Sequence, residues 1–289
     1  MYSLLMTLQL VLSPVADTTK AAFPYLIRST PKFDWKQYEL KVDARYKDSV
    51  INALKKFYPF YIGDEYADKK TYSKAFHFVH LNGDQLPDLV YEGWNGSEGN
   101  MVEMYINRKH SMEKVFRDFQ HIVQWDFRNN QLQSFVLFNE GCCAETVMFE
   151  RHFMVDASMH CRLVLQRSIL SGMGAFDVGF AAPEQYFDQP VRFKTATDEY
   201  ALRYSPEITN KPPNALDFDD HKGNVICLYP KGSKGKAWGY KKDDTGREWW
   251  LVEMDPRSRL SFKQYYDYDE KPTYYFGWMS SRYLEKMKR

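Results

Sequence analysis

The spacing of apolar and polar positions changes once along this chain of 289 residues. In residues 47–57 four apolar side chains recur at helical spacing, lysines face away from them, and Pro59 ends the run. Beyond Pro59 the apolar residues fall into short segments separated by Asn, Gly and Asp, which favour turns. We therefore predict one helix over residues 47–57, followed by strands over residues 75–79, 89–92, 101–106, 119–125, 132–138, 147–155 and 161–170.

Aromatic residues make up 17% of the chain, which favours pleated, half-buried surfaces. From residue 225 to residue 284, short apolar strands alternate with glycine-bearing turns, and aromatic residues lie at the strand ends. We expect a mainly β protein with some helix (α+β): a sheet-rich first domain followed by a small β-barrel.

Composition shifts divide the chain into four predicted parts. Residues 1–20 form a probable signal segment, and residues 21–202 form the sheet-rich domain. Residues 203–217 form a linker, since Pro206 and a proline pair stiffen this stretch. Residues 218–289 form the barrel.

The N-terminal apolar run has the length of a signal-peptide core and is too short to span a bilayer. It predicts export to the periplasm or the extracellular space; the alternative is a buried N-terminal strand or helix. No other stretch reaches transmembrane length. The formal net charge of +1 gives no reason to expect a nucleic-acid partner.

A turn at residues 82–88 carries oxygen side chains at alternate positions and a glycine between them. Asn82, Asp84 and Asp88, with the carbonyl of Leu86, are able to surround a hard cation such as calcium. This string resembles the FG-GAP (VCBS-type) motif of β-propeller and integrin-like extracellular proteins, which implies a calcium site. His80 stands where that motif has an acidic ligand, so we expect weak calcium binding and no other cofactor. The alternative is an Asx-type turn whose side chains bond their own backbone.

Three strings near the C-terminus occur in the order found in bacterial SH3-like (SH3b) domains. They are Cys227-Leu228-Tyr229, Trp249-Trp250 and the closing segment from Gly277 to Leu284. The chain from residue 218 resembles that family, and the resemblance implies an SH3-like barrel that binds peptide or cell-wall polymer. Pro230, Lys231 and Ser280 replace ridge residues of the eukaryotic family, which argues against a proline-rich ligand.

The predicted ligand-binding surface consists of aromatic residues from separate barrel strands. Strand alternation sends one member of the tryptophan pair inward and the other outward. We expect the outward member to join three other rings on one face of the barrel, so that the candidates are Tyr229, Trp249, Trp250, Trp278 and Tyr283.

Four cysteines, Cys142, Cys143, Cys161 and Cys227, are compatible with buried free thiols. If a disulfide forms, pairing of Cys161 with one of the neighbouring cysteines is favoured over a strained bridge between neighbours. Cys142 or Cys143 could act as a nucleophile only with a histidine base, for which His77, His152 and His160 are candidates.

These patterns favour a non-enzymatic exported binding protein whose barrel engages a cell-envelope or extracellular ligand. One alternative is a cell-wall hydrolase that uses a Cys–His pair and carries the barrel for targeting. Another is a purely structural barrel.

Overall fold

The computed structural model describes residues 24–27, 32–57, 74–94, 99–139, 145–173, 181–209, 224–258, 262–263 and 273–288. The probable signal segment, most of the predicted linker, Cys142 and Cys143 lie outside these residues. Within the described ranges, no helix combines the length and the apolar character needed to cross a membrane.

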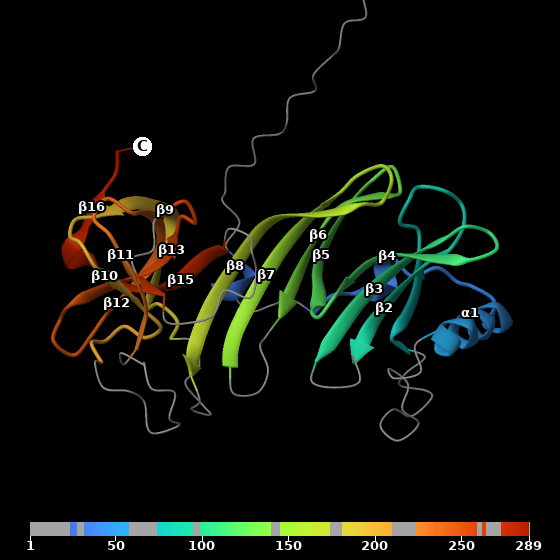
Figure 1. The fold of residues 1–289 in the computed structure, drawn as a ribbon, viewed down its shortest axis with the longest axis horizontal. Coiled ribbons are helices and arrows are strands. Elements are labelled where there is room, and N and C mark those ends of the chain that lie inside the picture. The colour runs from blue at the N-terminus through green and yellow to red at the C-terminus, as the bar shows by residue number, and fades with distance from the viewer. Residues whose placement is uncertain are drawn as a thin grey trace, which may run out of the picture.

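The first layer is an antiparallel sheet of four strands in sequence order. Helix α1 (Ala44–Phe57) covers its outer face and lies at one end of the molecule (Figure 1). Ile51 and Leu54 of α1 are buried against apolar residues of the sheet. The strands are β1 (Phe76–Val79), β2 (Asp88–Trp94), β3 (Asn100–Asn107) and β4 (Met112–Asp118).

The second layer is a meander of four longer strands at the centre of the molecule. Its apolar residues interleave with those of the first sheet, so that Val90, Val102 and Met104 share one core with Trp125 and Phe135. The strands are β5 (His121–Arg128), β6 (Gln131–Asn139), β7 (Glu145–Val155) and β8 (Cys161–Met173).

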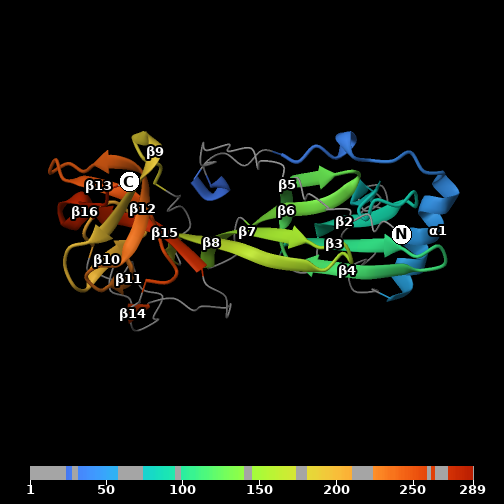
Figure 2. The same ribbon diagram turned by 90° about the horizontal axis from the view of Figure 1, so that it is seen from above.

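The third part contains the C-terminal strands and lies at the opposite end from α1 (Figure 2). Its strand β15 runs parallel to β8, which joins the meander and the C-terminal strands into one continuous sheet. The strands are β9 (Gln185–Thr195), β10 (Tyr200–Arg203), β11 (Val225–Tyr229), β12 (Lys234–Lys242), β13 (Glu248–Met254), β14 (Phe262–Lys263), β15 (Thr273–Ser280) and β16 (Leu284–Lys286); a 3-10 turn, η4 (Ser281–Tyr283), precedes β16.

Strand pairing crosses the predicted domain boundary at residues 203–217. Strands β9 and β10 precede that boundary, yet β9 pairs with β12 and β16, and β10 pairs with β11 and β15. The outermost strands, β14 and β16, do not pair with each other, so the described C-terminal strands form a curled open sheet and no closed barrel. The mainly β class with some helix is confirmed.

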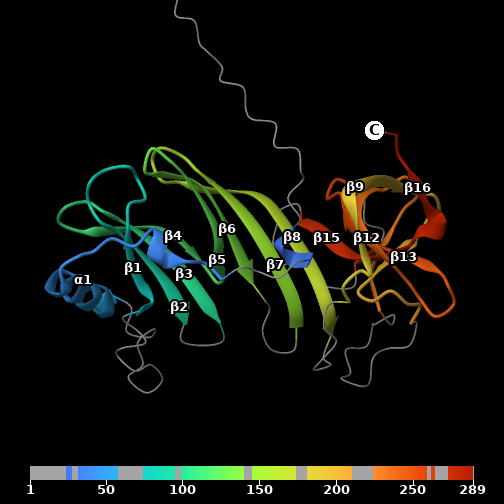
Figure 3. The same ribbon diagram turned by 180° about the vertical axis from the view of Figure 1, so that it is seen from behind.

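Two short 3-10 segments bind the layers together. Residues Tyr25–Ile27 (η1) are all buried and lie beside β7 and β8 (Figure 3), in a core shared with Trp238, Trp249 and Trp278. The segment around Trp35–Gln37 (η2) covers the junction between the first two sheets, where Phe33, Trp35 and Tyr38 pack around Trp125.

Candidate functional site

The predicted aromatic surface of the C-terminal sheet is buried. Only Tyr283 is exposed, at 45%, whereas the other four candidates are between 0% and 4% exposed: Tyr229, Trp249, Trp250 and Trp278. These four rings therefore form no open groove in this structure, although Tyr283 remains accessible beside Tyr200.

The expectation that one of Trp249 and Trp250 faces outward is wrong, because β13 is covered on both faces. Trp249 packs into the core that contains η1 and Phe276, and Trp250 packs into a second core with Phe193. Each indole N–H donates to a nearby carboxylate, from Trp249 Nε1 to Asp243 Oδ2 at 2.9 Å and from Trp250 Nε1 to Glu248 Oε1 at 2.6 Å. Strand alternation separates two faces, but it does not predict that both will be covered.

The predicted calcium turn directs its oxygen atoms to the backbone. Asn82 Oδ1 accepts from the Asp84 amide at 3.0 Å, and Asp84 Oδ1 accepts from the Leu86 amide at 2.7 Å. His80 Nδ1 lies 3.1 Å from the Leu86 carbonyl oxygen, the atom expected to contribute to the cation site. These are the contacts of an Asx-type turn, in which side chains stabilise the loop itself.

Asp88, the remaining predicted calcium ligand, is fully buried, and its carboxylate accepts hydrogen bonds from two backbone amides. Its carboxylate accepts from the amides of Leu81 at 2.8 Å and Asn107 at 2.9 Å. Burial raises its pKa, an effect that these two hydrogen bonds oppose. The part of the chain that the structure describes contains no group of three metal-ligating side chains, and weak calcium binding stays a prediction.

Cys161 is a free thiol at the start of β8, opposite Val155. The other end of the β7–β8 hairpin pairs Glu145 with Met173. Cys142 and Cys143, the partners favoured for Cys161 if a disulfide forms, lie outside the described residues, so that pairing stays a prediction. Cys227 is buried in the C-terminal sheet.

We expect the Cys161 thiol to react slowly in the native protein. Burial, helped by the charge of Asp156, raises its pKa to about 12, which leaves very little thiolate near neutral pH. Iodoacetamide should modify Cys161 at least ~100-fold more slowly in the folded protein than in urea, as measured by mass spectrometry of the peptides. Equal rates in both conditions would contradict the buried geometry.

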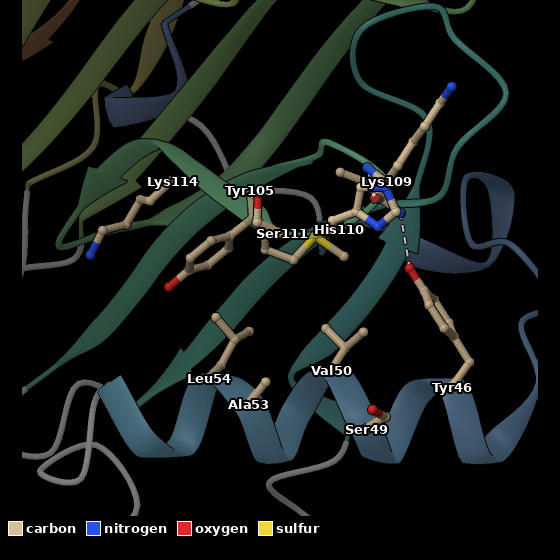
Figure 4. Close-up of a pocket in the computed structure, with 12 residues that line it drawn as sticks. Tyr46, Ser49, Val50, Ala53, Leu54, Tyr105, Lys109, His110, Ser111 and Lys114 are labelled. Carbon is tan, nitrogen blue, oxygen red and sulfur yellow. Dashed lines mark hydrogen bonds between the residues drawn. The ribbon is translucent and has the colours of Figure 1, made fainter.

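A cavity of about 720 Å³ lies between α1 and the β3–β4 hairpin (Figure 4). This volume is within the range of small-molecule sites, roughly 300–1,000 Å³. From the helix come Tyr46, Ser49, Val50, Ala53 and Leu54; from the hairpin come Tyr105, Asn107, Lys109, His110, Ser111, Met112 and Lys114.

The helix side of the cavity is a single stripe of residues with one-turn spacing. Positions 46, 49, 50, 53 and 54 lie on one face because side chains three and four residues apart are neighbours on a helix. Ser49 and Ala53, one turn apart, are both small, so they leave the space beneath the hairpin unfilled. Val50 and Leu54 give the same stripe an apolar character.

Hydrogen bonds centred on Asn107 hold the hairpin end of the cavity in place. Asn107 Nδ2 donates to Tyr46 Oη at 2.9 Å and to the Pro87 carbonyl at 3.1 Å, which ties α1 to the sheet. Asn107 Oδ1 accepts from the Lys109 amide at 2.9 Å, and Lys109 has a left-handed backbone with φ of 69°. This turn places Lys109 and His110 near the Tyr46 end of the stripe, with the Lys109 side chain extending away from the helix (Figure 4).

Sequence reasoning placed the helix but missed the cavity. The available signal was the pair of small residues, Ser49 and Ala53, within an otherwise amphipathic segment. That pattern becomes informative only once the hairpin that faces it is known, because small residues on a helix also permit close packing.

No family model matches the chain, and neither a curated protein nor a solved structure matches it.

Proposed function

We propose that this protein is a non-enzymatic binding protein and that the cavity between α1 and the β3–β4 hairpin holds a small apolar ligand. The observation that carries the proposal is the combination of an unfilled volume of about 720 Å³ with a mainly apolar wall. Val50, Leu54 and Met112 supply apolar contact, while hydroxyl and amide groups converge at one end, as is common in ligand sites.

The chemistry of the described residues favours binding over catalysis. Cys142 and Cys143, the candidate nucleophiles of the hydrolase alternative, lie outside the described residues, and the Cys161 thiol within them has its pKa raised to about 12. His152, a candidate base, contacts Glu150 at 2.6 Å and Arg167 at 3.4 Å. These contacts belong to an ionic network between strands, and they support a structural role for His152.

Export, and a ligand from the cell envelope or the extracellular space, remain part of the proposal. We also propose that the C-terminal sheet is related to SH3-like domains, because residues 218–289 resemble that family. Because its aromatic candidates Tyr229, Trp249, Trp250 and Trp278 are buried, this sheet supports the fold in our proposal, and ligand binding is assigned to the opposite end of the molecule.

Filling the cavity should abolish binding without unfolding the protein. We expect Ala53→Trp to weaken binding of the neutral apolar dye Nile red at least ~10-fold, because the indole would occupy the space between helix and hairpin. Fluorescence titration measures the affinity, and thermal melting checks the fold.

Asn52→Trp is the matched control, since Asn52 is exposed on the same helix and does not line the cavity. This variant should bind the dye like the wild type. Undiminished binding by a folded Ala53→Trp protein, or no binding by the wild type, would reject the proposed site.

A further inference from the structure

We infer that the ligand of the cavity is an amphiphile with one anionic head group, which lies at the Tyr46 end. This inference rests on the proposed function and adds the chemical class of the ligand. It is carried by an asymmetry of charge and polarity along the cavity.

The Tyr46 end of the cavity carries a lysine and a histidine that have no acidic partner among the described residues. Lys109 and His110 are exposed and form no ion pair within the described residues. The neighbouring Arg108 differs, since its Nε lies 2.7 Å from Glu113 Oε2. No aspartate or glutamate occurs among the described residues that line the cavity.

Tyr46 adds a hydrogen-bond donor at the same end. Its Oη accepts from Asn107 Nδ2, which leaves the hydroxyl proton available for a head-group oxygen. Burial raises the pKa of Tyr46, the hydrogen bond from Asn107 lowers it, and the charge of Asp88 raises it. The net pKa lies above the ordinary value, so the phenol keeps its proton. The Asp88 carboxylate is itself occupied by the Leu81 and Asn107 amides.

The other end of the cavity suits an apolar chain. Leu54 lies there opposite Tyr105, with Val50 between that end and Tyr46 (Figure 4). Lys114 also lies at this end, but its Nζ is 3.1 Å from Glu103 Oε1, a buried carboxylate that compensates its charge. From Tyr46 to Leu54 the helix rises by about 12 Å, a length suited to an extended hydrocarbon chain of moderate size.

The chemistry at the head-group end does not distinguish a carboxylate from a phosphate monoester. Both are anions that accept hydrogen bonds from a phenol, an ammonium group and an imidazole. A fatty acid and a lysolipid-type phosphate are therefore two sources of the same recognition chemistry.

The test uses amphiphiles with the same chain and different head groups, titrated into the full-length protein by calorimetry. Decanoate, decyl phosphate, decanol and decylammonium are the four probes. We expect at least one of the two anions to bind ~10-fold or more tightly than decanol, and decylammonium to bind most weakly. The preferred anion distinguishes a carboxylate ligand from a phosphate ligand.

Two variants locate the head group. Lys109→Met combined with His110→Gln should reduce anion affinity to the level of decanol, with decanol affinity unchanged. Tyr46→Phe, which keeps the ring, should weaken anion binding several-fold by removing one donor. Both variants change side chains at the protein surface or a single hydroxyl, and melting curves confirm that they fold.

The outcomes separate this inference from the proposed function. Equal affinity for decanol and for both anions in the wild type would overturn the anionic head group while leaving the cavity as a binding site. If the folded double variant keeps the anion preference of the wild type, the head group does not lie beside Lys109 and His110. Absence of binding by all four probes, together with no Nile red binding, would overturn both proposals.

Discussion

Replacing Arg167 by methionine is expected to lower the free energy of unfolding by about 3–5 kcal/mol, because it would leave two buried carboxylates without their cation. Arg167 Nη1 lies 2.6 Å from Glu150 Oε1, and its Nε lies 3.1 Å from Glu253 Oε1. Glu150 is fully buried and Glu253 is 2% exposed, so solvent would not replace the guanidinium. Urea denaturation of the wild type and the variant measures the difference.

This ionic network links three parts of the chain that are distant in sequence. Glu150 and Arg167 are directly opposite each other on β7 and β8, while Glu253 lies on β13, beyond β15. Glu150 Oε2 also accepts from the Leu26 amide at 3.1 Å, which fixes η1. Although burial raises the pKa of Glu150, its contacts with His152 and Arg167 outweigh that effect and hold the pKa below its ordinary value.

The matched control removes the arginine and both of its glutamate partners in the same variant. In a triple variant, Arg167→Met with Glu150→Gln and Glu253→Gln, the three charges of this network are removed, and the amide oxygens still accept from Leu26 N–H and Trp238 Nε1–H. We expect the triple variant to recover a large part of the loss seen with Arg167→Met alone. A triple variant less stable than the single one would show that packing of the arginine stem dominates over charge.

The protonation of His77 by itself should also lower the free energy of unfolding by about 3 kcal/mol as the pH decreases from 6.5 to 4. Burial, reinforced by the charge of Lys47, lowers the pKa of His77 to about 4. Between pH 4 and 6.5 the unfolded chain therefore binds a proton that the folded protein excludes, so acid favours unfolding. His77 is 8% exposed and stacks on Trp35 with ring centroids 3.8 Å apart.

His77→Phe isolates this contribution, since phenylalanine retains a stacking ring and does not titrate. The difference in unfolding free energy between wild type and variant should change with pH over this window and remain constant above pH 7. Other carboxylates titrate equally in both proteins and cancel in the difference. A pH-independent difference would mean that the protonated imidazole is accommodated, for example by Glu39, whose Oε1 is 3.7 Å from Nδ1.

Local sequence patterns predicted most of the helices and strands, but they did not predict which distant strands pair with each other. The helical spacing of residues 47–57 identified α1, which begins slightly earlier, at Ala44. Apolar runs followed by turn residues identified the strands of the two N-terminal sheets except β4 (Met112–Asp118), which was not predicted. The membership of β9 and β10 in the C-terminal sheet was not predicted, because pairing between strands depends on residues distant in sequence.

The candidate site was harder to predict than the fold for a related reason. The aromatic residues of the C-terminus drew attention because tryptophan and tyrosine are frequent binding anchors. Large aromatic rings are equally suited to filling a core, and η1 and β9 cover the faces that were expected to be open. The cavity under α1 is formed by small and common residues, whose significance depends on what lies opposite them.

The parallel pairing of β8 with β15 has a consequence for synthesis on the ribosome. After β8 is complete at Met173, about 100 further residues must be made before β15 begins at Thr273, which takes roughly 5–20 s at ordinary elongation rates. During that interval residues 166–169 of β8, which pair with β15, lack their native partner. Exposed strand edges pair readily with other chains, so we expect this stretch of β8 to favour aggregation of the nascent protein until β15 has been made.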